Sequence, residues 1–276
     1  MQLTRRSVCG LFLATTLPGI SEAKLFIPTA DLWALWDLAD QSNDAVIDHS
    51  AWQALLDTYL ATQDPSGIHR FDYSGAKESG QADLRAYIDR LASLDPRQYN
   101  RREQLAYWIN LYNALTIDVV LQKYPVKSIR DVYGGIIRLG PWNRVLVEIA
   151  GHPLTLNDIE HRILRPIYAD PRIHYSLNCA SLGCPNLAAQ AYTGRNVDAL
   201  LSQGGRAYVN HPRGASFVNG RLSLSKIYYW FAEDFGDDEA GVIGHVASFA
   251  DPELAMWLRN YAGPVRYAYD WRLNAP

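Results

Sequence analysis

The sequence predicts an α+β fold with helix in the majority, arranged as a single globular domain with two short β-hairpins. Three observations lead to this expectation. Apolar residues recur at helical spacing over most of the chain, whereas two pairs of short apolar segments flank turn sequences. No Ser/Gly-rich linker, charge block or internal repeat divides the 276 residues. We therefore expect residues 24–276 to form one domain.

The first 23 residues have the composition of an export signal. Arg5 and Arg6 give a positive start, an apolar run covers residues 8–17, and Ser21-Glu22-Ala23 places small residues where signal peptidase reads them. The run is shorter than the roughly 18 residues of a membrane span. The arginine doublet is also typical of a twin-arginine signal, so both export routes stay open. We expect a cleaved signal and a periplasmic or secreted mature protein.

Helical periodicity dominates the first half of the chain. The longest helix is predicted from Asn100 to Lys123, ending before Pro125, with its apolar residues in one stripe. Asn110 and Asn113 lie on a different face of it, where they need hydrogen-bond partners. Three shorter helices precede it, over residues 31–39, 50–62 with Ser50 as the N-cap, and 81–94.

Two turn sequences predict the hairpins. Gly140-Pro141-Trp142-Asn143 separates the strands of the first, and Asn219-Gly220, a strong hairpin signal, separates those of the second. The alternation of Tyr267, Tyr269 and Trp271 suits a final strand. The hairpin strands are residues 136–139 with 145–149, and 216–218 with 221–224. Further helices are expected over residues 156–164, 197–209, 225–234, 239–249 and 253–261.

Composition and charge exclude several classes of protein. With 48% hydrophobic residues the chain has enough apolar surface to fold, so disorder is excluded. The net charge is −3, and loss of the first 23 residues (two Arg, one Glu) leaves 24 basic and 28 acidic residues, a net −4. This balance lacks the excess of Lys and Arg with which proteins bind the phosphates of nucleic acids, so a nucleic-acid partner is not expected. No later stretch is apolar enough to span a membrane, so the mature protein is not expected to do so.

Reactive residue types concentrate between Thr155 and Pro185. Thr155 and Asp158 form a capping-box pattern, and Arg162 can pair with Asp158 one helical turn away. We expect Pro166 to close this helix after Arg165. Glu160, His161, His174 and Cys179 all follow within this segment, and these types perform nucleophilic and acid–base work.

Four ordered blocks of the sequence resemble the bacterial and plant family called domain of unknown function 547. The resemblance covers roughly Phe71 to Asn274 and implies family membership without an assigned reaction, so the mechanism has to be argued from the residues. The blocks are residues 107–115 (YWINLYNAL), 158–161 (DIEH) with Arg165, 170–181 (DPRIHYSLNCAS) with Cys184-Pro185, and 269–274 (YDWRLN).

Cys179 has two interpretations. As a nucleophile it needs a lowered pKa and a nearby base. His161 is the better base candidate, with Glu160 or Asn110 as the group that orients it. If residues 172–178 are helical, Cys179 lies at a helix C-terminus, which disfavours a thiolate; if they form a strand, it can open the next turn. The alternative is a disulfide with Cys184, which in an exported protein is equally reasonable.

Other residues are candidates for binding. Asn110 and Asn113 can supply amide donors near Cys179, and Arg172 or Arg165 can receive an anionic group of the substrate. His174, five residues before Cys179, is a further binding candidate and can equally be a core histidine. The His and Cys spacings match no short zinc signature, so we expect neither a metal nor another cofactor.

Two functions from different classes follow. The first is an exported cysteine-dependent hydrolase or acyl transferase, with Cys179, His161 and Glu160 as catalytic residues and a small-molecule or peptide-like substrate. The second is a non-enzymatic extracytoplasmic binding domain in which Cys179 and Cys184 form a structural disulfide. The number of ionisable groups in one segment favours the first.

Overall fold

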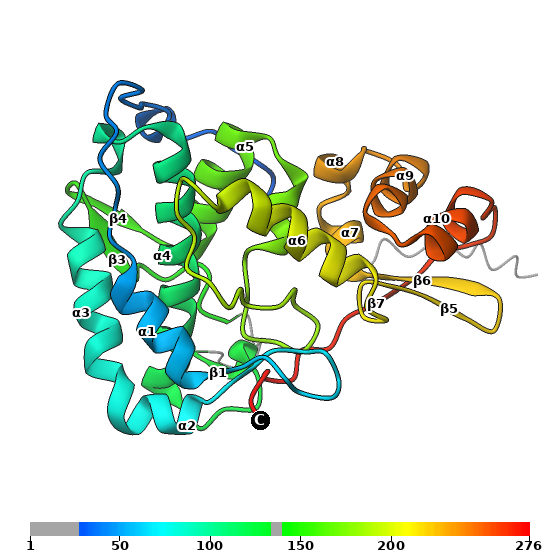
Figure 1. Ribbon diagram of the computed structural model, residues 1–276, viewed down its shortest axis with the longest axis horizontal. Coiled ribbons are helices and arrows are strands. Elements are labelled where there is room, and N and C mark those ends of the chain that lie inside the picture. The colour runs from blue at the N-terminus through cyan, green and yellow to red at the C-terminus, as the bar shows by residue number, and fades with distance from the viewer. Residues whose placement is uncertain (1–27, 134–139) are drawn as a thin grey trace, which may run out of the picture.

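Helices are the dominant secondary structure of the computed structural model, which describes residues 28–133 and 140–276, and they make up about half of those residues (Figure 1). The prediction of a helix-majority α+β fold is confirmed. The predicted export signal and the predicted strand 136–139 lie outside the described residues. No helix within the described ranges has the length and apolar character needed to cross a membrane.

Helix α4 (Arg101–Lys123) forms the centre of the molecule. It begins where predicted, with the Asn100 side chain accepting hydrogen bonds from the amides of Arg102 and Glu103, both at 3.1 Å. The prediction of a single apolar stripe is wrong, because nearly every residue from Glu103 to Leu121 is buried. A helix covered on all sides has no solvent face, so its polar residues must find partners inside the protein.

Two neighbouring elements begin or end differently from the prediction. Residues 31–39 contain only a 3-10 helix, η2 (Ala34–Trp36), because the amides of Asp31 and Trp33 bond to the carbonyls of His161 and Arg162 instead of to their own turn. Helix α1 (Ser50–Tyr59) starts with Ser50 as its first residue, and His49 holds the cap position.

The helix predicted over 81–94 starts earlier in the structure. A continuous helical run comprises α2 (Tyr73–Gly75), the π-helix η3 (Ala76–Gly80) and α3 (Gln81–Ala92). The Asp72 carboxylate caps it by accepting from the Gly75 amide at 2.9 Å. Gly80 is needed here for packing, because a Cβ on it would lie 2.5 Å from the Tyr59 ring. Gly80 therefore allows close contact between this helical run and the end of α1.

In the part of the chain that the structure describes, short strands form three small sheets. The second predicted hairpin is confirmed as β5 (Ala215–Val218) and β6 (Arg221–Ser225), joined by Asn219 and Gly220 at φ 53° and 74°. The final strand, β7 (Arg266–Ala268), is parallel to β6 and ends before Tyr269. The other pairs are β1 (Leu60–Ala61) with β2 (Arg70–Phe71), and β3 (Val147–Ile149) with β4 (His152–Leu154). The strand predicted at 145–149 thus pairs with a segment that was not predicted as a strand.

The buried side chains form two cores. The main core surrounds α4 and includes α1 and α3. The C-terminal core is smaller and lies on the other side of the molecule, with α6 (Val197–Val209) between them (Figure 1). Its elements, besides β5–β7, are α7 (Lys226–Trp230), α8 (Ala232–Phe235), α9 (Glu239–Phe249) and α10 (Pro252–Arg259). Helices α6, α9 and α10 match the predictions closely, whereas the helix predicted over 225–234 is broken at Phe231 into α7 and α8.

The segment between the cores contains a wide helical turn. Thr155 and Asp158 cap it reciprocally, as predicted: the Asp158 amide donates to the Thr155 hydroxyl, and the Thr155 amide donates to the Asp158 carboxylate, each at 3.0 Å. It continues as the π-helix η6 (Asp158–Leu164) and as α5 (Arg165–Tyr168). The prediction that Pro166 ends this helix is wrong, since proline is accepted in the first turn of α5. The 3-10 helix η7 (Pro171–Tyr175) follows, so residues 172–178 are neither a full helix nor a strand.

Candidate functional site

A cavity of about 370 Å³ lies where the two cores meet. The main core and the η6 helix supply one wall, and α7 and the C-terminal tail supply another. Glu160, His161, His174 and Cys179, all singled out from the sequence, line it together. The remaining lining residues are mostly aromatic or polar: Pro28, Tyr112, Arg130, Trp142, Asn143, Asn157, Leu177, Cys184, Lys226, Ile227, Trp230, Phe231, Tyr269 and Trp271.

Cys179 and Cys184 are joined by a disulfide in the wall of this cavity. The loop between them is held in place because the Asn178 side chain accepts from the Ala180 amide at 2.8 Å and donates to the Pro185 carbonyl at 2.7 Å. Cys184 is 2% exposed, whereas Cys179 is only partly buried. Of the two sulfur-bearing residues, Cys179 is therefore the more accessible.

Tyr269 lies against both sulfur atoms. Its hydroxyl is 3.0 Å from Cys179 Sγ and 3.1 Å from Cys184 Sγ. Burial raises the pKa of Tyr269, so its hydroxyl keeps its proton and can donate to sulfur. Ser181 adds a second hydroxyl, 3.4 Å from Cys179 Sγ.

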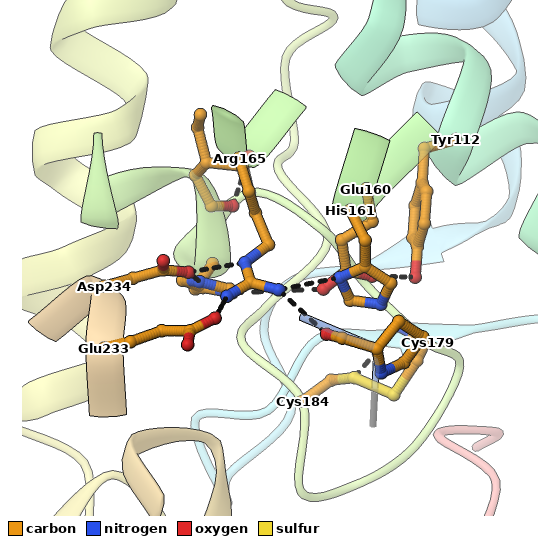
Figure 2. A network of polar contacts seen from close by, with 12 residues as sticks. Tyr112, Glu160, His161, Arg165, Cys179, Cys184, Glu233 and Asp234 are labelled. Atoms are coloured by element: carbon orange, nitrogen blue, oxygen red, sulfur yellow. Dashed lines mark hydrogen bonds and ion pairs between the residues drawn. A yellow bond between two sulfur atoms is a disulfide. The ribbon is translucent and has the colours of Figure 1, made fainter. Parts of the chain in front are cut away.

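A buried arginine fixes one of the two cavity histidines. Arg165 lies between the carboxylates of Glu233 and Asp234 on one side and the ring of His161 on the other (Figure 2). Its Nε and Nη2 each donate to a carboxylate at 2.5 Å, and its Nη1 donates to His161 Nδ1 at 3.1 Å and to the Pro28 carbonyl at 3.1 Å. The side chain of Arg165 is only 2% exposed.

This contact sets the tautomer of His161. A guanidinium can only donate, so Nδ1 must accept and the neutral ring carries its proton on Nε2. Burial lowers the pKa of His161 below its ordinary value; the Glu160 carboxylate opposes this shift and the Arg165 cation adds to it. The ring is therefore neutral near pH 7. In this arrangement His161 presents an N–H donor at Nε2, and the nitrogen that can take a proton is Nδ1, after Arg165 has released it.

The second histidine has the opposite environment. His174 Nε2 lies 2.6 Å from the Asp234 carboxylate, and its Nδ1 lies 3.9 Å from Glu160 Oε1. The Phe231 ring stacks on it, with the ring centroids 4.3 Å apart. A carboxylate on one ring nitrogen orients an imidazole and stabilises its cation, as a general base requires.

Glu160 extends this set into the cavity. Its Oε2 accepts a hydrogen bond from the Tyr112 hydroxyl at 2.9 Å. Burial raises the pKa of Tyr112 well above its ordinary value, and Glu160 adds to this, so the hydroxyl remains a donor. Burial alone would raise the pKa of Asp234, but hydrogen bonds from His174 and Arg165 outweigh it and lower the pKa to about 2. Asp234 thus orients His174, and Glu160 lies 3.9 Å from the other ring nitrogen; Glu160 and His174, which both line the cavity, are called the Glu160–His174 set below.

Three predicted binding residues lie outside the cavity lining. Asn110 donates to the carbonyl of Tyr192 at 2.7 Å and accepts from its amide at 3.0 Å. Arg172 is ion-paired with Asp170 and Asp198. Asn113 donates to the Ser176 carbonyl and accepts from the Asn178 amide, both at 2.9 Å, and so it fixes the backbone just before Cys179. Contact of these residues with a substrate stays a prediction.

The sequence reasoning missed the partners of the reactive groups. Asp234 and Lys226 lie more than forty residues from Cys179 on short helices, and no local pattern connects them to it. Tyr269 belongs to a recognised block, but its place beside the sulfur atoms came only from the fold. Trp230 was part of a predicted helix with no assigned function. Among the described residues no cluster of three His, Cys, Asp or Glu side chains suits a metal ion.

Comparison with protein families matches residues 96–209 to the family described as "Protein of unknown function, DUF547". The match confirms the resemblance seen in the sequence over this part of the chain. It includes α4, the η6 helix, η7, the disulfide loop and α6, whereas α7–α10 and Tyr269 lie beyond it. No match was found among curated proteins or among solved structures.

Proposed function

We propose that the chain is an exported cysteine-dependent hydrolase or acyl transferase, and that its nucleophile is the Cys179 thiolate formed when a thiol reductant opens the disulfide. The observation that supports this most is the shared cavity: Cys179 lines it together with His161, Glu160 and His174. Nucleophilic catalysis needs such a combination of a sulfur, a hydrogen-bond donor and an acid–base group. Export is supported by the composition of the first 23 residues.

The surroundings of Cys179 suit a nucleophilic thiolate better than those of Cys184 do. Cys179 is the more exposed of the two, and the Tyr269 hydroxyl can donate to its sulfur. A hydrogen bond to the charged form lowers the pKa of a thiol. After reduction the Cys179 amide can still donate to Cys184 Sγ, which lies 2.9 Å away, so the resolving thiol stays in place.

The reaction can be assigned to the residues step by step. A dithiol reductant gives two electrons and two protons to the disulfide and becomes a disulfide itself. The Cys179 thiol passes its proton to the Glu160–His174 set, and the thiolate attacks the carbonyl carbon of an ester or amide, forming a C–S bond, while His161 Nε2–H donates to the developing oxyanion. The C–O or C–N bond breaks, and the leaving group takes that proton from the Glu160–His174 set. Water or an acceptor amine then attacks the thioester and gives its proton to the same set, the C–S bond breaks, and Cys179 leaves as the thiolate.

A binding domain remains the second candidate because the disulfide is formed in the structure. In that function the bridge would stabilise the cavity wall and no thiolate would appear. The two cysteines are only 5 positions apart, so closing so short a loop removes little entropy from the unfolded chain. A bridge that contributes little to stability is better explained by chemistry at its sulfur atoms.

Two cysteine variants separate the functions. Cys184→Ser leaves Cys179 permanently free, whereas Cys179→Ser removes the proposed nucleophile and serves as its matched control. We expect Cys184→Ser to hydrolyse p-nitrophenyl acetate without reductant, the wild type to do so only after reduction, and Cys179→Ser to lose about a thousandfold in rate or more. Iodoacetamide should label Cys179 in the folded Cys184→Ser protein, detected by mass spectrometry. An unreactive Cys179 in a correctly folded variant would exclude the enzyme and leave the binding domain.

A further inference from the structure

We propose that the cavity binds a monoanionic carboxylate of its substrate at Lys226, with a ring or other apolar part of the same molecule packed on Trp230. This rests on the proposed function in taking the cavity as a substrate site. Lys226 and Trp230 are four residues apart on α7, so they share one face of the helix, and both line the cavity.

Three donors of the cavity have no acceptor in the described part of the chain. No hydrogen bond or ion pair engages the ammonium of Lys226 or Nε2 of His161 there. The Trp230 indole N–H is buried and also has no partner among these residues. A buried donor without an acceptor is costly, so the Trp230 N–H favours a ligand that brings an acceptor oxygen, and Lys226 and His161 offer further donors to it.

The formal charges of the lining set the charge of that ligand. Arg130 and Lys226 are positive and Glu160 is negative, so the Arg, Lys and Glu side chains of the described lining carry a net +1, while His174 is paired with Asp234. A carboxylate neutralises this charge. A phosphate dianion would leave an excess negative charge in the same cavity as Glu160.

Of Arg165, Arg172 and Lys226, only Lys226 has no ion pair or hydrogen bond to the described residues. Arg165 is occupied by Glu233 and Asp234, and Arg172 by Asp170 and Asp198. Those two arginines were the candidates that the sequence offered for an anionic group, and the structure places both in ion pairs.

Aromatic rings provide the apolar part of the site. Trp230 lies 5.5 Å from Trp271 and 4.9 Å from Tyr269, measured between ring centroids, with tilted planes. Arg130 stacks on Trp271 with its guanidinium carbon 5.3 Å from the ring centroid, and so covers part of that ring. Tryptophan offers a wide apolar surface with one polar edge, which suits a ligand that is apolar at one end and charged at the other.

The test uses two probes that differ in one charge. N-acetylphenylalanine carries a carboxylate, and N-acetylphenylalaninamide has the same ring and shape without it. Their binding to the oxidised, full-length mature protein is measured by calorimetry for the wild type, Lys226→Met and the control Lys77→Met, which changes a half-buried lysine of η3 outside the cavity lining. We expect the carboxylate to bind about tenfold more tightly than the amide in the wild type and in Lys77→Met.

Loss of this preference in Lys226→Met, with the affinity for the amide unchanged, supports the proposal. Equal affinity of the two probes in the wild type, no binding of either, or tighter binding of phenyl phosphate than of N-acetylphenylalanine would overturn it. Because binding to the oxidised protein needs no thiolate, its failure is separate from that of the proposed hydrolase. A carboxylate preference without turnover in Cys184→Ser would leave this inference standing and reject the enzyme.

Discussion

The main core and the C-terminal core contribute different things to the cavity. The main core is built around α4 and leads through the η6 helix to Glu160 and His161. The C-terminal core is rich in tyrosine and phenylalanine, and its helices bring Lys226, Trp230 and Asp234 to the same place. One core thus carries reactive groups that are close in sequence, whereas the other carries the partners that set their charge and orientation.

This difference shows why the boundary between the cores matters. Asp234 binds both Arg165 and His174, so a single carboxylate of α8 ties the C-terminal core to two reactive segments. Tyr269, just beyond β7, holds the sulfur atoms in the same way. If these contacts are lost, the two cores can remain folded while the site is no longer assembled.

The largest effect is expected from breaking the buried ion pairs across the boundary. Arg165→Met leaves Asp234 without one of its two partners and removes the hydrogen bonds to His161 and Pro28. We expect the free energy of unfolding to fall by about 3–5 kcal/mol, measured by urea unfolding followed by tryptophan fluorescence. Arg172→Met is the matched control, since its ion pairs are more exposed and should contribute at most about 1 kcal/mol. Equal losses in the two variants would contradict the special role of the boundary.

Acidification compares the two cores directly, through one histidine in each. Burial lowers the pKa of His49, beside the main core, and of His245, on α9, to about 4. Each ring protonates near pH 6.5 in the unfolded chain, so its contribution to stability is complete above that pH and is lost as the pH falls toward 4.

For His49, which is 4% exposed, the free energy of unfolding lost between pH 7 and pH 4 is about 3 kcal/mol. For the partly exposed His245 the loss is smaller. The loss of stability that each histidine causes on acidification is measured by urea unfolding of His49→Gln and His245→Gln at several pH values. The pH dependence should flatten more in His49→Gln, and a pH dependence identical to that of the wild type in both variants would show that neither ring is held neutral.

The smallest effect is expected from removing the Tyr269 hydroxyl, which contacts both sulfur atoms of the disulfide. Tyr269→Phe should lower the free energy of unfolding by about 1 kcal/mol, and in the Cys184→Ser background it should raise the pKa of the Cys179 thiol, because a donor to the thiolate is gone. The thiol pKa is measured from the pH dependence of iodoacetamide labelling. Tyr59→Phe, whose hydroxyl bonds Ser79 at an exposed position, is the control and should change neither quantity. An unchanged thiol pKa in Tyr269→Phe would show that Tyr269 does not contribute to the reactivity of Cys179.

Elements with strong local signals were predicted well. Asn100 caps α4 because a short polar side chain satisfies the first amides of any helix, whatever surrounds it. Asn219-Gly220 forms a hairpin turn for an equally local reason, the ease with which both residues adopt positive φ. Residues 31–39 were predicted wrongly, because their amides bond to the η6 segment in preference to a helical turn.

The sequence by itself determined the fold class and the location of the reactive residues along the chain. It predicted a helix-majority α+β fold, a central helix with buried asparagines, and a segment that carries Glu160, His161, His174 and Cys179. Hydrophobic periodicity, caps and turns are local properties, so they can be read from neighbouring residues. Only the tertiary structure decided how those side chains are used. It joined Cys179 to Cys184, placed Arg165 on Nδ1 of His161 and Asp234 on Nε2 of His174. Proton positions and charge depend on contacts between residues distant in the chain, and packing of the two cores creates those contacts.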